Sequence, residues 1–269
     1  MSIQINNKTY QAFIFDVDDT LIDTSKSYDE AIKRTVKHFT SAEVSDEHLN
    51  LVRSHGIAYG VNNDWNVTWL LIELVKKFPT EKWKKLLTNQ VLNEINPKSA
   101  EYFEINVFFQ NIYLGNPYFN GQGLIDTAEK KWYTDKFFPT LKGLGIKMAV
   151  VTSRPTDEAR YTLKNVNGLV GEFIENEDFI ISAGSKNAQG QLIAEKPSPE
   201  PILECLKRLN LGPKDCAYVG NSTGDYIAAR DADVDFIQVG YSQIERRNEP
   251  PGFNYLKLDS VNDLVIGNW

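Results

Sequence analysis

The sequence has few cysteines and no long apolar run. Cys205 and Cys216 are its only two cysteines, too few for a framework of disulfide bonds, so we expect both to pack in the core of a protein from a reducing compartment. Met1 to Lys8 is polar and lacks the apolar stretch of a secretory signal, and no run is long enough to cross a bilayer. Together these absences predict a cytoplasmic protein.

An excess of positive charge is also missing. The chain carries 29 Lys and Arg against 36 Asp and Glu, a formal charge of −7. Surfaces that bind nucleic acid or anionic membrane are usually basic, so the charge argues against both partners. Local cations must then steer an anionic substrate. A monomer and a homodimer both remain open.

What is present fits an α/β protein of two domains. At 269 residues and 42% apolar content the chain can bury a large core. Apolar runs predict strands and 3.6-residue periodicity predicts helices. The expected strands are 11–15, 146–151, 179–182, 216–219 and 236–239, and the expected helices are 28–39, 65–78, 81–95, 127–144, 157–164, 200–209 and 225–231. Outside residues 27–119 strands and helices alternate, which predicts a doubly wound parallel sheet. Little pattern follows Gly240.

Two carboxylates follow the first of these strands. Residues 11–15 are continuously apolar, as expected of a strand covered on both faces, and Asp16 and Asp18 come directly after it. A carboxylate at the carboxyl end of such a strand lies where open α/β sheets bind ligands, and it can attack phosphorus while its second oxygen binds a cation. Asp18 is placed to exchange protons with a leaving oxygen. The alternative is a helix N-cap or an Asx turn.

Three further segments carry complementary chemistry. Thr152-Ser153-Arg154 ends a second apolar strand with a hydroxyl, which together with nearby backbone N–H groups holds a phosphate oxygen without adding negative charge. Lys196 precedes a predicted helix and supplies a cation. Asn221 and Asp225 follow a third strand in a glycine-containing turn. Each segment alone fits ordinary turn and cap chemistry, but their combination indicates phosphoryl transfer.

In this order the segments resemble the four motifs of the haloacid dehalogenase superfamily of phosphohydrolases. The matching positions are Asp16-Val17-Asp18-Asp19-Thr20-Leu21, Thr152, Lys196-Pro197, and residues 220–225. The resemblance runs from about Tyr10 to about Gly240, excluding the inserted segment. More narrowly, the chain resembles the subfamily with a helical cap inserted between the first and second motifs. It implies a Rossmann-like α/β core formed by residues 1–24 and 121–269, and an α-helical cap formed by residues 25–120.

The resemblance also implies roles for individual residues. Asp16 would become an aspartyl-phosphate, Asp18 would act as general acid and base, and Thr152 and Lys196 would bind the transferring phosphoryl group. The implied cofactor is Mg²⁺. Its expected ligands are Asp16, Asp18, Asn221 and Asp225.

One position departs from the family pattern. The fourth motif usually opens with an acid that binds the metal directly, and this chain has Asn221 there. An amide oxygen brings no charge, whereas Mg²⁺ sites typically rely on one or two carboxylates plus substrate phosphate. We therefore expect weak metal affinity that bound substrate partly restores.

Substrate contacts are expected from two places. Next to the second motif they are Ser153 and Arg154, although Arg154 has an alternative partner in Glu158. The expected contacts in the cap are Asn62, Asn63, Asp64 and Trp65. A structural interpretation of these four is equally open: Asp64 caps the helix that begins at Trp65, and Trp65 and Trp69 belong to the core.

The leading functional interpretation is a Mg²⁺-dependent phosphatase that hydrolyses a small phosphorylated metabolite. Two alternatives remain. A phosphosugar mutase would use the same aspartyl-phosphate and return the phosphoryl group to a sugar. A catalytically weak or inactive protein that binds a phosphorylated ligand is the third interpretation, and Asn221 is the reason for it.

Overall fold

The structure is a computed structural model of the chain and describes residues 3–5, 8–55, 63–89, 92, 95–115 and 122–266. Its contacts divide the chain into two compact units. The core unit is Met1–Asp23 with Lys130–Trp269, and the helical unit is Thr24–Glu129. The predicted domain borders stay a prediction, and the helical unit continues past residue 120 because α6 (Leu124–Thr127) packs against α5 (Ala100–Leu114).

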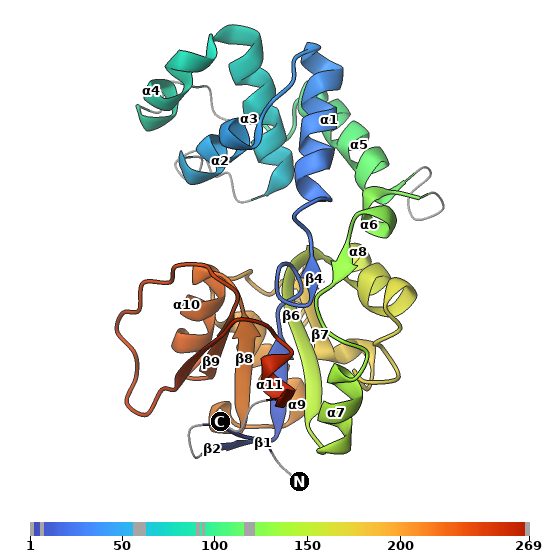
Figure 1. Cartoon of the computed structure of the whole chain (residues 1–269), viewed down its shortest axis with the longest axis vertical. Coiled ribbons are helices and arrows are strands. Elements are labelled where there is room, and N and C mark those ends of the chain that lie inside the picture. Colours follow the sequence, from blue (N-terminus) through green and yellow to red (C-terminus); the bar gives the residue numbers. More distant parts are fainter. Residues whose placement is uncertain are drawn as a thin grey trace. The chain divides into compact units, whose positions relative to one another are not determined.

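A sheet of six parallel strands forms the centre of the core unit (Figure 1). Its spatial order is β10-β9-β8-β3-β6-β7, and every neighbouring pair is parallel. In that order the strands are Tyr255–Leu258, Asp235–Val239, Cys216–Gly220, Ala12–Phe15, Lys147–Pro155 and Ile180–Ala183. The prediction of a doubly wound α/β fold is confirmed.

The order of the strands places the predicted motifs. From β3 in the middle, the chain adds β6 and β7 on one side and then β8, β9 and β10 on the other. The order therefore reverses between β3 and β8, where Phe15 pairs with Val219. Open α/β sheets bind ligands outside the carboxyl ends of their strands at such a switch point. Asp16 follows β3 directly, and Asn221 follows β8 directly.

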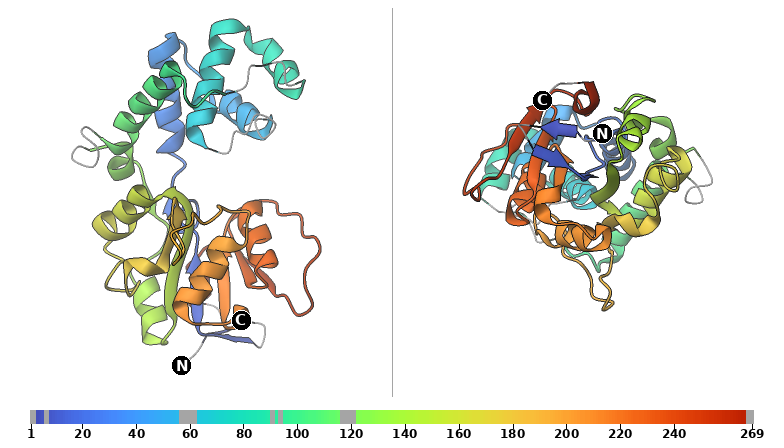
Figure 2. Two further views of the ribbon diagram at one scale, coloured as in Figure 1. Left: turned by 180° about the vertical axis from the view of Figure 1, so that it is seen from behind. Right: turned by 90° about the horizontal axis from the view of Figure 1, so that it is seen from below.

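Both faces of the sheet are covered by apolar layers. Phe13 and Phe15 of β3 pack into one layer with residues of α7, α8 and α11, whereas Ala12 and Ile14 pack into the other with residues of α9 and α10. In Figure 1, α7 and α11 lie in front of the sheet, and α9 lies in front in the rear view of Figure 2. Burial on both faces explains the continuous apolar run of β3. The bounds of these helices are α7 (Phe137–Gly143), α8 (Thr156–Arg160), α9 (Glu200–Leu209), α10 (Thr223–Asp231) and α11 (Asp263–Ile266).

Two sequence-based expectations for the core unit are wrong. The predicted helix 127–144 contains strand β5 (Lys130–Lys131), which pairs with β4 (Ile22–Asp23), so that only α7 is helical after it. The segment after Gly240 contains β10, an edge strand in which Leu258 is the single buried residue. An edge strand of this kind shows no apolar run, which is why the sequence pattern missed it.

Shorter elements complete the core unit. β1 (Ile3–Ile5) and β2 (Lys8–Tyr10) form an antiparallel pair. A π-helix, Tyr161–Val166, continues α8, so the predicted helix 157–164 changes type after Arg160. Two 3₁₀ turns are Glu177–Phe179 and Pro213–Asp215.

The helical unit is built around α3 (Asp64–Lys77). Its residues 67–74 are all buried, which is the pattern of a central helix enclosed by its neighbours. It contacts α1, α2 and α5. Among the described residues, the other helices of the unit are α1 (Tyr28–Thr40), α2 (Asp46–His55), α4 (Trp83–Thr88), α5 and α6, with a 3₁₀ turn at Thr80–Lys82.

The sequence pattern predicted α1 and α3 but missed α2 and α5, and it extended the helix at 81–95 beyond the observed end at Thr88. In α5 apolar residues lie on both faces, since Ile105 is buried whereas Phe103 is 69% exposed. The 3.6-residue periodicity is blurred as a result.

The two cysteines lie in the core, as the sequence predicts. Cys205 and Cys216 are both buried and free. Within the part of the chain that the structure describes, every helix is too short or too polar to cross a membrane.

A buried carboxylate lies at the amino ends of the strands, away from the predicted motifs. Asp235 is the first residue of β9 and is 1% exposed. Its Oδ2 accepts hydrogen bonds from Lys8 Nζ at 2.6 Å and from the Tyr10 hydroxyl at 2.7 Å, and its Oδ1 accepts one from the Asn254 backbone at 3.0 Å. Burial alone would raise the pKa of Asp235, but these donors outweigh it, so the pKa is lowered. The network joins β2, β9 and the segment before β10.

We expect Asp235→Asn to lower the free energy of unfolding at pH 7 by about 2 kcal/mol, because charge-assisted hydrogen bonds are lost. A lowered folded-state pKa means that the ionised carboxylate stabilises the fold above its unfolded-state pKa and ceases to do so as the pH falls through the folded-state pKa. The difference between variant and wild type should shrink below about pH 4. Urea unfolding at pH 7 and pH 3 measures it, with the exposed Asp259→Asn as control. A difference equal at both pH values would contradict the assignment.

Candidate active site

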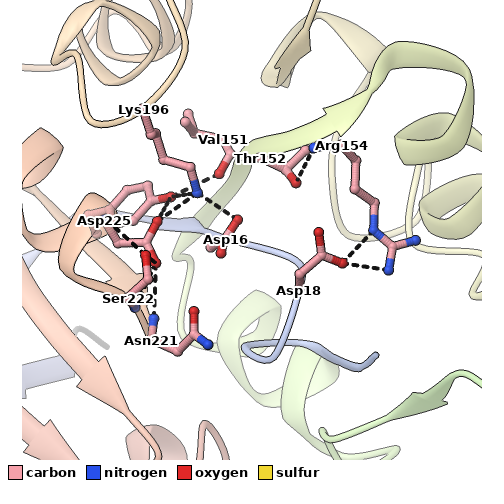
Figure 3. A network of polar contacts seen from close by, with 10 residues as sticks. Asp16, Asp18, Val151, Thr152, Arg154, Lys196, Asn221, Ser222 and Asp225 are labelled. Atoms are coloured by element: carbon pink, nitrogen blue, oxygen red, sulfur yellow. Dashed lines mark hydrogen bonds and ion pairs between the residues drawn. The ribbon is translucent and has the colours of Figure 1, made fainter. Parts of the chain in front are cut away.

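Asp16 is fixed at the switch point by the backbone. Its N–H donates to the Val219 carbonyl at 2.9 Å, so hydrogen bonding between β3 and β8 continues one residue past β3. The residue is 6% exposed. Its Oδ1 accepts from Lys196 Nζ at 2.8 Å, and its Oδ2 has no hydrogen-bond donor among the described residues. Asp16 therefore keeps one oxygen that is not committed to the protein (Figure 3).

Lys196 comes from the segment between β7 and α9 and joins three acceptors. Besides Asp16, its Nζ donates to Asp225 Oδ1 at 2.6 Å and to the Tyr218 hydroxyl at 3.1 Å. An ammonium group has three N–H donors, so all three are used. A phosphate that approaches Lys196 must share or replace one of these acceptors.

One cation lies between two buried carboxylates in this cluster. For Asp225 burial favours the neutral form, but Lys196 and the Ser222 donors outweigh it, and the pKa is lowered. For Asp16 burial and the nearby charge of Asp225 outweigh Lys196, and the pKa is raised to about 7. Burial would lower the pKa of Lys196, but the two carboxylates outweigh it and raise the pKa. Lys196 and Asp225 thus form the stable ion pair, and Asp16 is harder to ionise.

Asp225 is held by a tight turn. Its Oδ2 accepts hydrogen bonds from the backbone N–H groups of Asn221 and Ser222 at 3.1 and 3.0 Å and from the Ser222 hydroxyl at 2.7 Å, and its own N–H donates to that hydroxyl at 3.1 Å. This reciprocal arrangement is a capping box at the start of α10. Both oxygens of Asp225 are therefore engaged by protein donors.

Gly220 makes room for this turn. A Cβ added at Gly220 would lie 2.8 Å from Asp225 Cβ, Cγ and Oδ2. A Cβ atom does not approach other heavy atoms so closely, so a side chain here would push Asp225 away.

Asp18 is held by a different cation. Arg154 Nε and Nη2 each lie 2.6 Å from Asp18 Oδ1, and the Asp18 side chain is 31% exposed. In Figure 3 Asp18 is turned toward Arg154, on the side opposite Lys196. The Arg154 backbone N–H also donates to Thr152 Oγ1 at 3.2 Å. Since that oxygen already accepts a bond, the Thr152 hydroxyl proton can be directed to a phosphate oxygen.

The oxygens near Asp16 fit a small divalent cation. Asp16 and Asp18 each have one carboxylate oxygen that accepts no hydrogen bond from the described residues. The same is true of the Asn221 carboxamide oxygen, which is turned toward Asp16 in Figure 3. Among those residues no group of three or more His, Cys, Asp or Glu side chains could hold a metal ion. The free oxygen of Asp16 and the amide oxygen of Asn221 fit Mg²⁺, which takes few protein ligands and completes its shell with water and substrate phosphate.

The other predicted contacts have different outcomes. Ser153 is exposed next to Thr152. Arg154 is paired with Asp18, a partner that the sequence did not suggest. Tyr218 and Thr162, which contact Lys196 and Arg154, were also missed. A tyrosine in an otherwise apolar buried strand was the available signal, because its hydroxyl needs a partner.

The predicted cap residues lie in the helical unit. Asn62 lies outside the described residues. Asn63, not Asp64, caps α3, because Asn63 has extended backbone and its Oδ1 accepts from the Asn66 N–H at 2.9 Å. Asp64 is the first helical residue and forms an ion pair with Arg53 Nη2 at 3.0 Å.

The two tryptophans of this segment differ in burial. Trp65 is half-buried, and Trp69 is 8% exposed. The structural interpretation therefore holds for Trp69.

The match to a known family decides to which family the chain belongs. The model of the haloacid dehalogenase-like hydrolases matches residues 10–233, which include all four motifs. The chain belongs to this family. Its predicted membership and enzymatic nature, a haloacid dehalogenase-type phosphatase acting on phosphoric monoesters, are confirmed.

Known relatives cover nearly the whole chain. It is 22% identical over 268 residues to a phosphoglycolate phosphatase of Colwellia psychrerythraea, covering 95% of this chain and 96% of that one. It is 25% identical over 258 residues to a Clostridium perfringens protein named as a pyrophosphatase, PpaX, covering 95% and 97%. Among solved structures, a predicted phosphoglycolate phosphatase from Haemophilus somnus has a TM-score of 0.62 at 18% identity and covers 96% and 97%, which supports the fold.

We expect Gly220→Ala to lower the free energy of unfolding by about 1–3 kcal/mol, because the new methyl group overlaps Asp225. The matched control is Gly224→Ala in α10, where the nearest atom to the added Cβ is Ser222 Oγ at 3.6 Å. This helical change should be neutral or stabilise by up to about 1 kcal/mol. Urea unfolding compares the two, and equal stability of both variants would show that Gly220 is not needed for the turn.

Proposed function

We propose that the protein is a Mg²⁺-dependent phosphatase that hydrolyses a small phosphorylated metabolite through an aspartyl-phosphate on Asp16. The observation that supports this most strongly is the state of Asp16: one oxygen is paired with Lys196, and the other is not engaged by the described residues. A nucleophile needs such an oxygen, and its location at the switch point of the sheet suits an incoming ligand.

The residues around Asp16 have complementary roles in this proposal. Asp16 attacks phosphorus, and Asp18 gives a proton to the leaving oxygen and later takes one from the attacking water. The Thr152 hydroxyl donates to a phosphoryl oxygen. Lys196 holds Asp16 in place and balances negative charge. Asp225 and Tyr218 position Lys196, since they are its other two acceptors.

Mg²⁺ would be held by Asp16 and Asn221, because the free oxygen of Asp18 is the one that carries the proton. When bound, it supplies positive charge that offsets repulsion between Asp16 and the phosphate dianion. We assign Asp225 to Lys196 rather than to the metal, because both of its oxygens accept hydrogen bonds from protein donors.

The substrate is proposed to be a small phosphomonoester. Relatives named phosphoglycolate phosphatase make 2-phosphoglycolate the first candidate. The exposed Ser153 and the cap residues Asn63, Asp64 and Trp65 are the proposed contacts for the remainder of the molecule. The two free, buried cysteines support a reducing, cytoplasmic setting.

Two alternative functions can be tested by incubating the protein with phosphorylated metabolites. A phosphosugar mutase would give isomerised sugar phosphate without free phosphate. A catalytically weak protein that mainly binds a phosphorylated ligand is favoured by one observation, the neutral Asn221 at the proposed metal site. Such a protein would be stabilised thermally by a phosphorylated metabolite that it turns over only slowly.

We expect a screen of phosphorylated metabolites with Mg²⁺ to give phosphate release that falls at least about 1000-fold in Asp16→Asn, because the nucleophile is lost. Asp19→Asn is the control: it changes a carboxylate three residues away to an amide, and its φ of 52° suits Asn. Phosphate assays measure the activity of both variants, and mass spectrometry of enzyme stopped during turnover detects the phosphorylated Asp16. Equal activity of wild type and Asp16→Asn would exclude the proposed nucleophile.

We expect Asn221→Asp to tighten Mg²⁺ binding at least about tenfold, because it adds one negative charge beside the cation. Calorimetric titration with Mg²⁺ alone measures this without any turnover, and the exposed Asn248→Asp controls for the change in net charge. An unchanged affinity would show that residue 221 is not a ligand.

A further inference from the structure

Arg154 is buried where a phosphate-binding arginine would be expected to be open. The residue is 1% exposed, and its side chain is fully covered. A substrate arriving from solvent does not reach a covered guanidinium. Its contacts must therefore explain why an always-charged group lies in this interior, since burying an unpaired charge is costly.

The guanidinium is held from two directions. Nη1 donates to Thr162 Oγ1 at 2.6 Å, while Nε and Nη2 point to Asp18 Oδ1 at 2.6 Å each. Thr162 is itself 1% exposed and belongs to the π-helix Tyr161–Val166. The widened turn of a π-helix commonly occurs at functional sites. Arg154 is thereby a rigid link between this helix and Asp18.

The link distinguishes the two oxygens of Asp18. Both guanidinium donors converge on Oδ1, and within the described part of the chain Oδ2 accepts no hydrogen bond. A carboxylate anchored at one oxygen has a fixed rotamer and presents the other. We infer that Arg154 is a positioning residue that orients Asp18, so that Asp18 Oδ2 exchanges the proton with the leaving group, and that this makes Arg154 decisive for substrates with poor leaving groups.

The inference rests on the proposed function and follows from its first step. Asp16 forms a bond to phosphorus, the bond from phosphorus to the substrate oxygen breaks, and that oxygen takes the proton from Asp18. An alcohol leaving group needs this proton because an alkoxide is a poor leaving group, whereas 4-nitrophenolate leaves without it. In the second step water attacks phosphorus and returns a proton to Asp18, which restores Asp16 and releases phosphate.

The test compares two phosphomonoesters, glycerol phosphate and 4-nitrophenyl phosphate, in wild type and Arg154→Lys. The parameter is kcat/KM, which reports the steps up to departure of the leaving group. We expect about a 30- to 100-fold loss for glycerol phosphate, the size associated with a misplaced proton donor, and less than about threefold for 4-nitrophenyl phosphate. Inhibition by inorganic phosphate should be unchanged.

Two further variants keep the test decisive if Arg154→Lys folds poorly. Thr162→Val removes one hydrogen bond to Arg154 without touching Asp18, and we expect the same shift in selectivity at about threefold. Arg160→Lys is the matched control, because that arginine is half exposed and pairs with Glu177. It should leave the ratio of the two kcat/KM values unchanged.

The outcomes separate the inference from the proposed function. Equal losses for both substrates together with weaker inhibition by phosphate would make Arg154 a phosphate-binding group and overturn the inference alone. Lower thermal stability with wild-type kcat/KM for both substrates would make it purely structural, with the same consequence. Absence of turnover of both substrates and of the screened metabolites in wild type would overturn the proposed function, and the inference with it.

Discussion

The ion pairing of Lys196 is the interaction on which the candidate site depends. A single ammonium group donates hydrogen bonds to two carboxylates and a hydroxyl, which come from the end of β3, from β8 and from α10. Bringing two negative charges into a buried site is costly, and one cation offsets only part of that cost. Hydrogen bonds from Ser222 further stabilise the charge of Asp225. Asp16 has no such donors among the described residues and is left as the carboxylate with an unused oxygen.

The cluster explains why the sheet topology matters. β3 and β8 are neighbours although about 200 residues separate them in the sequence, and their pairing brings Asp16 next to the turn that holds Asp225. Lys196 completes the set from the loop before α9. A shift of one residue in the register of either strand would turn the reacting side chain toward the opposite face of the sheet. The dense apolar layers on both faces fix that register.

The sequence predicts the central strands and the motif residues because both follow from local rules. A strand buried on both faces must be apolar, and polar residues at its carboxyl end must lie at one edge of a parallel sheet. It does not predict that Arg154 pairs with Asp18, because Asp18 is 136 residues away and the pairing depends on side-chain directions in the folded protein. The edge strand β10 and the helix α5 were missed for a related reason. β10 buries a single residue, and α5 exposes apolar side chains as well as burying them, so neither shows a regular spacing of apolar residues in the sequence.

The buried network of Asp235 has a consequence for how this protein can vary. It holds together the amino ends of the strands, opposite to the reacting groups, so stability and catalysis depend on different ends of one sheet. Substitutions that strengthen or weaken that anchoring alter heat tolerance while the nucleophile keeps its surroundings. Substitutions intended to raise thermal stability can therefore be made first at this distal end.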